Sequence, residues 1–131
     1  MIIDESLLNK LSNEAGKDSR LRKNFNLHQS LNDEVQRLLN ALEPGTIMPI
    51  HRHLDTEETY MLLRGEMNII FYNDDKQITD TFLLSTAKGN FGIHIPAKQW
   101  HSLEVIEKGT VIFEVKKGPY HPFRQEDIME L

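Results

Sequence analysis

Two histidines one residue apart form the clearest chemical pattern in the sequence. His51 and His53 lie in a segment expected to be a strand, and because side chains alternate between the faces of a strand, both imidazoles should point the same way. Carboxylates follow at Glu57 and Glu58, and His101 enters much later in the chain. Such a set suits one divalent transition metal ion, namely Fe, Mn, Ni, Co or Zn, whereas Ca²⁺ and Mg²⁺ prefer oxygen ligands.

The histidine pair has a second interpretation, because two histidines at this spacing also occur as surface imidazoles on an edge strand. The sequence contains no cysteine, which excludes a disulfide framework, a thiolate metal site and a cysteine nucleophile. Chemistry in this chain therefore depends on histidines, on carboxylates or on a metal held by nitrogen and oxygen.

Strands are predicted to position these residues. From Gly45 onward, short runs rich in Ile, Val, Phe, Tyr and Thr alternate with turn residues, as is typical of an all-β barrel or sandwich. The predicted strands are residues 46–53, 58–64, 66–72, 77–84, 91–95, 100–106 and 110–116. Ahead of them, apolar spacing predicts a helix over residues 4–15, and residues 17–34 read as an irregular, polar connection. The apolar residues of 35–42 fit a helical stripe at least as well as a strand.

Length and charge restrict the class of protein. The 131 residues, 39% hydrophobic and 27% charged, are those of a globular chain with one domain. The net charge of −5 and the scattered basic residues argue against nucleic-acid binding and favour a small-molecule ligand. No basic region followed by an apolar run and no membrane-length apolar window is present, so we expect no membrane partner and a cytoplasmic location.

The region around the histidine pair resembles the first motif of the cupin superfamily. That motif runs glycine, five residues, His-x-His, three or four residues, glutamate, six residues and glycine. The chain matches every fixed position, with Gly45, His51, His53, Glu58 and Gly65. The six-residue step back from the last glycine selects Glu58 as the carboxylate ligand.

The second cupin motif is matched less closely. Pro96 and His101 keep their spacing, which makes His101 the fourth metal ligand that the resemblance implies. Gly89 stands one residue too early, Lys98 replaces the turn glycine, and Val105 replaces an asparagine. The ligand is thus better supported than the turn that presents it.

Residues along nearly the whole chain carry a more specific resemblance. They are Arg22, Asn24, Asn26, His28, Val35, Arg37, Asn40, Pro44, Gly45, His51, Arg52, His53, Trp100, His101, Phe113, Glu114, Lys116, Gly118 and Tyr120. On these residues the chain is similar to WbuC-type cupin-fold metalloproteins, which are associated with O-antigen (lipopolysaccharide) gene clusters. This resemblance implies that residues 35–42 form the first barrel strand. It also implies an all-β cupin barrel (a double-stranded β-helix or jelly roll) with a short N-terminal helix, in which residues 1–34 pack on a barrel of residues 35–131.

Secondary pocket candidates lie outside the ligand set. His28 and Asn26 would serve a ligand if their segment folds over the barrel mouth, but they equally fit a solvated loop. Arg37 and Arg52 would clamp an anion if they face the lumen, although such arginines more often lie on the outer face.

The reaction stays open at this stage, because cupin barrels host many chemistries. One hypothesis is a metal-dependent enzyme, such as an isomerase, epimerase or oxygenase, acting on a small carbohydrate-derived or oxo/hydroxy substrate in surface-polysaccharide metabolism. The other is a non-catalytic, metal-dependent binding or regulatory domain. A homodimer is also expected, since partners often cover the free strand edges of such barrels.

Overall fold

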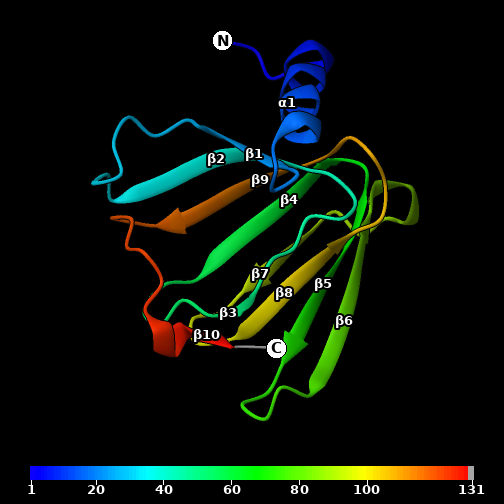
Figure 1. Ribbon diagram of the computed structural model, residues 1–131. Coiled ribbons are helices and arrows are strands. Elements are labelled where there is room, and N and C mark those ends of the chain that lie inside the picture. Colours follow the sequence, from blue (N-terminus) through cyan, green and yellow to red (C-terminus); the bar gives the residue numbers. More distant parts are fainter. Residues whose placement is uncertain (130–131) are drawn as a thin grey trace.

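The protein is described over residues 1–129 by a computed structural model, in which two five-stranded sheets with antiparallel pairing enclose the core (Figure 1). In order across the first sheet lie β1 (Arg22–Asn26), β2 (Val35–Leu42), β9 (Thr110–Lys117), β4 (Glu58–Arg64) and β7 (Gly92–Ile95). The second sheet contains β10 (Ile128–Met129), β3 (Ile50–His51), β8 (Trp100–Val105), β5 (Glu66–Tyr72) and β6 (Ile78–Ser85). The helices are α1 (Glu5–Lys17) and the short 3₁₀ helices η1 (Thr86–Lys88) and η2 (Gln125–Asp127).

This architecture confirms the predicted all-β barrel with a helix at its N-terminal side. The strands β4, β5, β6, β7, β8 and β9 lie within one or two residues of the predicted segments. Within residues 1–129, none of the helices combines the length and the apolar character that a membrane crossing requires.

The barrel interior is filled by apolar side chains from both sheets. Leu42 and Ile112 come from the first sheet, and Met67 and Ile69 from the second; all four are fully buried. Burial of such side chains is the main favourable term in folding, at roughly 1.5–3 kcal/mol for each. We call this the inner core.

A second apolar cluster lies on the outer face of the first sheet, beneath α1. Leu11 and Ala15 of the helix pack with Leu39 and Val111 of the sheet. The helix begins where the side chain of Asp4 accepts a hydrogen bond from the Leu7 N–H, which is a common N-cap arrangement. We call this cluster the outer core.

Strand β2 shows why the helical pattern of residues 35–42 was misleading. It pairs with β1 on one side and with β9 on the other, as the family resemblance implies. Leu39 belongs to the outer core, whereas Leu42 belongs to the inner core. A strand that is buried on both faces loses the alternation of polar and apolar residues, so local spacing could not reveal it.

Two further sequence predictions need correction. The connection expected to be irregular contains strand β1, a polar edge strand in which Phe25 packs against the outer core. The strand predicted over residues 46–53 is reduced to the two residues of β3, because the chain leaves the sheet before His53. Polar residues at a sheet edge and a short strand both give weak sequence signals.

Candidate metal centre

The structure brings His51, His53, Glu58 and His101 together. One ligand atom from each of these residues lies within 4.8 Å of the other three, so the cluster could hold a metal ion. His51 of β3 lies directly opposite His101 of β8, and their ring centroids are 4.2 Å apart. Glu58 begins β4 and crosses from the first sheet to complete the cluster.

Backbone carbonyls set the tautomers of two imidazoles. The Nδ1 of His51 lies 2.8 Å from the Pro49 carbonyl oxygen, and the Nδ1 of His101 lies 2.9 Å from that of Gln99. Because a carbonyl only accepts, each Nδ1 must carry the proton and donate. Each Nε2 is then left with a free lone pair, which is how metal-binding histidines are oriented in proteins.

The electrostatics of the cluster also match a metal site. Burial lowers the pKa of His51 to about 3, and the charge of His101 adds to this, so the imidazole is neutral near pH 7. Burial alone would raise the pKa of Glu58, but the imidazoles of His101 and His53 hold it well below its ordinary value. The neutral imidazole of His51 and the ionised carboxylate of Glu58 are forms that can bind a metal.

Two buried atoms of the cluster have no hydrogen-bond partner among the described residues. The Nε2 atoms of His101 and His53 lie 3.0 and 3.1 Å from Glu58 Oε1. Nevertheless, among the described residues neither Glu58 Oε1 nor His101 Nε2 has a hydrogen-bond partner, although both atoms are buried. Burying polar atoms in this way is costly. A divalent cation between the donor atoms would satisfy them, so the residues fit the metal that the sequence predicts.

The turn before β8 connects two segments of the candidate metal centre. Lys98, in place of the motif's glycine, adopts a left-handed conformation with φ of 71°. Its backbone N–H donates to the His53 carbonyl oxygen at 2.8 Å. The turn thus ties the segment of His53 to the strand of His101 at the expense of backbone strain.

The C-terminal segment closes one side of the cluster. It leaves the first sheet after β9 and crosses to the second sheet, where Ile128 of β10 pairs with His51 (Figure 1). On the way, the ring of Phe123 lies 4.8 Å from that of His51 and 5.1 Å from that of His53. An apolar ring thus covers two of the candidate ligands.

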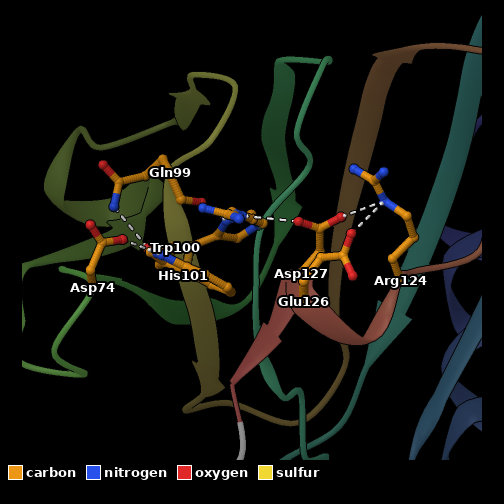
Figure 2. A network of polar contacts seen from close by, with 8 residues as sticks. Asp74, Gln99, Trp100, His101, Arg124, Glu126 and Asp127 are labelled. Carbon is orange, nitrogen blue, oxygen red and sulfur yellow. Dashed lines mark hydrogen bonds and ion pairs between the residues drawn. The ribbon is translucent and has the colours of Figure 1, made fainter.

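A polar network fixes this segment and the neighbouring strand, as Figure 2 shows. The buried carboxylate of Asp127 contacts Arg52 at 3.0 Å and Arg124 at 3.3 Å. The Arg52 guanidinium also lies 4.4 Å above the Trp100 ring, whose indole N–H donates to Asp74. Arg52 is therefore held in place beside the candidate ligands.

A buried carboxyl lies deeper in the barrel. Glu114 of β9 is opposite Tyr60 of β4, and it accepts a hydrogen bond from the side-chain amide of Asn40 at 3.0 Å. Burial, with the nearby charge of Glu58, raises the pKa of Glu114 to about 7. This group therefore holds a proton up to about neutral pH.

The other candidates lie apart from the cluster. His28 is buried and contacts the Arg37 backbone through Nδ1. The Arg37 side chain is on the outer face with Leu39, and Asn26 is exposed on β1. A cleft opens beside His53, and of the four secondary candidates only Arg52 lines it.

Two other potential ligands, Glu57 and His94, lie outside the cluster. His94 lies on the exposed surface, within 3.2 Å of Glu57 and 3.0 Å of Thr59. Glu57 is thus engaged outside the barrel, and Glu58 is the carboxylate that joins the histidines.

Three residues near the cluster were given no role by the sequence. Glu114 and Lys116 alternate with Val115 on β9, a pattern that could have marked an inward polar face. Phe123 follows a polar, irregular stretch and carried no local signal. Its position depends on the path of the C-terminal segment across the barrel.

Fold and cluster together define a cupin-fold protein with a site that could hold a metal. The model of one family, described as Domain of unknown function (DUF6016), matches residues 3–84, which is more than half of the chain. The chain therefore belongs to this family. No curated protein matches the chain.

Solved structures support the same fold. The cupin domain of Cnp3 from Schizosaccharomyces pombe has a TM-score of 0.59 at 12% identity, over 73% of this chain and 64% of that one. KdgF from Halomonas sp. has a TM-score of 0.61 at 10% identity, over 79% of this chain and 84% of that one.

CapF, a capsular polysaccharide assembling protein from Staphylococcus aureus, has a TM-score of 0.58 at 21% identity. The match covers 76% of this chain but 28% of CapF, so the chain spans less than a third of that protein. At these identities the likeness concerns the fold.

Proposed function

We propose that this protein binds one divalent transition metal ion through His51, His53, Glu58 and His101. We further propose that the ion serves an activity on a small carbohydrate-derived or oxo/hydroxy substrate in surface-polysaccharide metabolism. The observation that carries the metal proposal is the convergence of the four donor atoms within 4.8 Å of one another. The carbonyl contacts at Nδ1 of His51 and His101 leave both Nε2 atoms ready for a metal.

When bound, the metal would polarise a carbonyl or hydroxyl oxygen of the substrate as a Lewis acid. The protein's own residues supply the surroundings. Phe123 shields His51 and His53 from solvent on one side. Glu114, with its pKa near 7, is a protonated carboxyl close to the charge of Glu58 and can hold or release a proton near neutral pH.

Two resemblances support the proposed polysaccharide context. The sequence is similar to WbuC-type proteins of O-antigen gene clusters over nearly its whole length. In addition, the fold is similar to part of CapF, which is described as a capsular polysaccharide assembling protein. A derivative of a sugar is accordingly the substrate class that we propose.

Elemental analysis tests the metal proposal. Wild-type protein purified after metal supplementation is expected to contain about one equivalent of a transition metal. A His51→Ala/His53→Ala double variant should lose it, because two of the four ligands are absent. His94→Ala is the matched control: this histidine is exposed and pairs with Glu57, so the variant should keep the metal.

Either of two results would contradict the proposal. One is a wild-type protein without stoichiometric metal, and the other is a double variant that retains it.

The proposed activity needs a separate test. Thermal-shift screening against sugar phosphates, nucleotide sugars and 2-oxo acids identifies ligands of the folded state. Turnover of such a ligand by the metal-free protein would show that the reaction does not need the ion.

A further inference from the structure

A cleft opens beside the candidate metal centre. It has a volume of about 400 Å³, which is within the range of small-molecule sites. Its walls come from three places: residues 52–56 after β3, the end of β9, and the C-terminal segment that carries Phe123. Because His53 belongs to both the cleft and the cluster, a ligand in the cleft lies next to the metal position.

The cleft is positively charged although the protein as a whole carries −5. Four basic side chains line it, against two acidic ones. They are Arg52, Lys116, Lys117, Arg124, Asp55 and Asp127. The excess of basic groups concentrates positive charge at the cleft, where a ligand carrying the opposite charge would be attracted.

The basic groups are not equally available. Asp127 pairs with both arginines, so its charge offsets theirs. Over residues 1–129, by contrast, no carboxylate lies within ion-pair distance of Lys116 or Lys117. Neither lysine is therefore neutralised by a contacting carboxylate, although the charge of Lys116 also acts on the buried Glu114.

Lys116 has the more favourable position of the two lysines. It lies directly opposite Glu58 in the pairing of β9 with β4, on the inward face that also carries Glu114. Side chains paired in this way are close neighbours. The Lys116 ammonium also lies 5.8 Å from the Tyr120 ring centroid, at the wall of the cleft. A ligand that reaches the metal at Glu58 thus has a cation within reach.

We propose that the cleft binds a small anionic molecule, whose carboxylate or phosphate is held by Lys116 while an oxygen elsewhere in the molecule reaches the metal. This inference rests on the proposed function and narrows its substrate class. A neutral sugar would leave the lysine without a partner, whereas a sugar phosphate or a hydroxy acid would pair with it. Charge-assisted hydrogen bonds of this kind are among the stronger ones in proteins.

Calorimetry on metal-loaded protein tests the inference with two matched pairs of ligands. Glucose 6-phosphate is compared with glucose, and glycolate with ethylene glycol. At least one charged member is expected to bind, and its neutral counterpart at least about tenfold more weakly. The pair in which the charged member binds more tightly shows whether the cleft prefers a phosphate or a carboxylate.

Two variants that each remove one positive charge test whether Lys116 holds the anion. Lys116→Gln is expected to weaken binding of the preferred anion by about tenfold or more. Lys108→Gln removes the same charge outside the cleft, beside Gly109 and Arg64, and should bind the anion as the wild type does. Both variants should keep one equivalent of metal, which shows that they are folded and loaded.

The two proposals fail in different ways. If the wild type holds one metal but neither anion binds, or the neutral members bind equally well, the inference is overturned while the metal proposal stands. Equal affinities of Lys116→Gln and Lys108→Gln would likewise overturn it. If no metal is bound at all, the proposed function itself fails, and the inference fails with it.

Discussion

The two faces of the first sheet differ in composition and in structural role. On the outer face, Leu39 and Val111 are packed beneath α1 in a cluster that is apolar throughout. On the inner face, Ile112 belongs to the inner core, but Glu114 and Lys116 follow it along the same strand toward the cleft. One strand therefore contributes to a purely structural core and to a polar interior beside the candidate metal centre.

The outer face is therefore purely structural, whereas the inner face combines apolar core packing with the polar residues beside the candidate metal centre. Substitutions on the outer face should change the free energy of unfolding and leave the metal centre alone. Substitutions of the polar residues on the inner face should instead change pH dependence, metal content or ligand binding. Substitutions at Leu11 and Glu114 test this difference between the two faces.

The largest effect is expected for the outer core. Leu11→Ala removes a fully buried side chain between α1 and the sheet, so it should lower the free energy of unfolding by about 2–5 kcal/mol. Denaturant unfolding measures the change. Leu31→Ala, at an exposed leucine, is the control and should cost less than about 0.5 kcal/mol.

The metal content of the Leu11→Ala protein, measured well below its unfolding temperature, should equal that of the wild type. A loss of metal from this folded variant would show that the two faces are coupled, contrary to the division drawn here.

The next effect concerns pH and the inner face. Because the folded pKa of Glu114 is raised to about 7 from an ordinary 4.5, folding favours its protonated form. Its contribution to stability is therefore present below pH 4.5 and is lost as the pH rises through 7. Glu114→Gln cannot ionise, so in metal-free protein its stability relative to the wild type should increase over this range, by up to about 3 kcal/mol.

Thermal unfolding of both proteins from pH 4.5 to 8 measures this difference. A difference between the two unfolding temperatures that does not change with pH would mean that Glu114 ionises normally in the folded protein.

The smallest effect concerns the strained turn at the metal centre. Lys98 has a φ of 71°, which glycine adopts without steric cost. Lys98→Gly should therefore stabilise the protein by roughly 0.5–1 kcal/mol, because relief of strain exceeds the added flexibility of the unfolded chain. Denaturant unfolding gives the value, and metal content should stay the same. A destabilised variant would show that the lysine side chain supports the turn.

Much of the fold was predictable from local pattern. Alternating β-favouring residues and turn signals located strands β4 to β9, and apolar spacing located α1, whereas the two-residue strand β10 was not predicted. Strand β2 could not be recognised in this way, since its burial on both faces removes the alternation. The family resemblance supplied the correct assignment because it includes information that spacing alone does not carry.

Residue type and motif spacing were enough to identify the side chains of the candidate metal centre, His51, His53, Glu58 and His101. The surroundings of these side chains, in contrast, arise from contacts that form when the chain folds. Lys116 becomes a neighbour of Glu58 through the register of β9 against β4, and the ring of Phe123 reaches the imidazoles because the C-terminal segment crosses between the sheets. Ligand identity is a property of residue type and spacing, whereas charge, burial and access depend on contacts between distant segments.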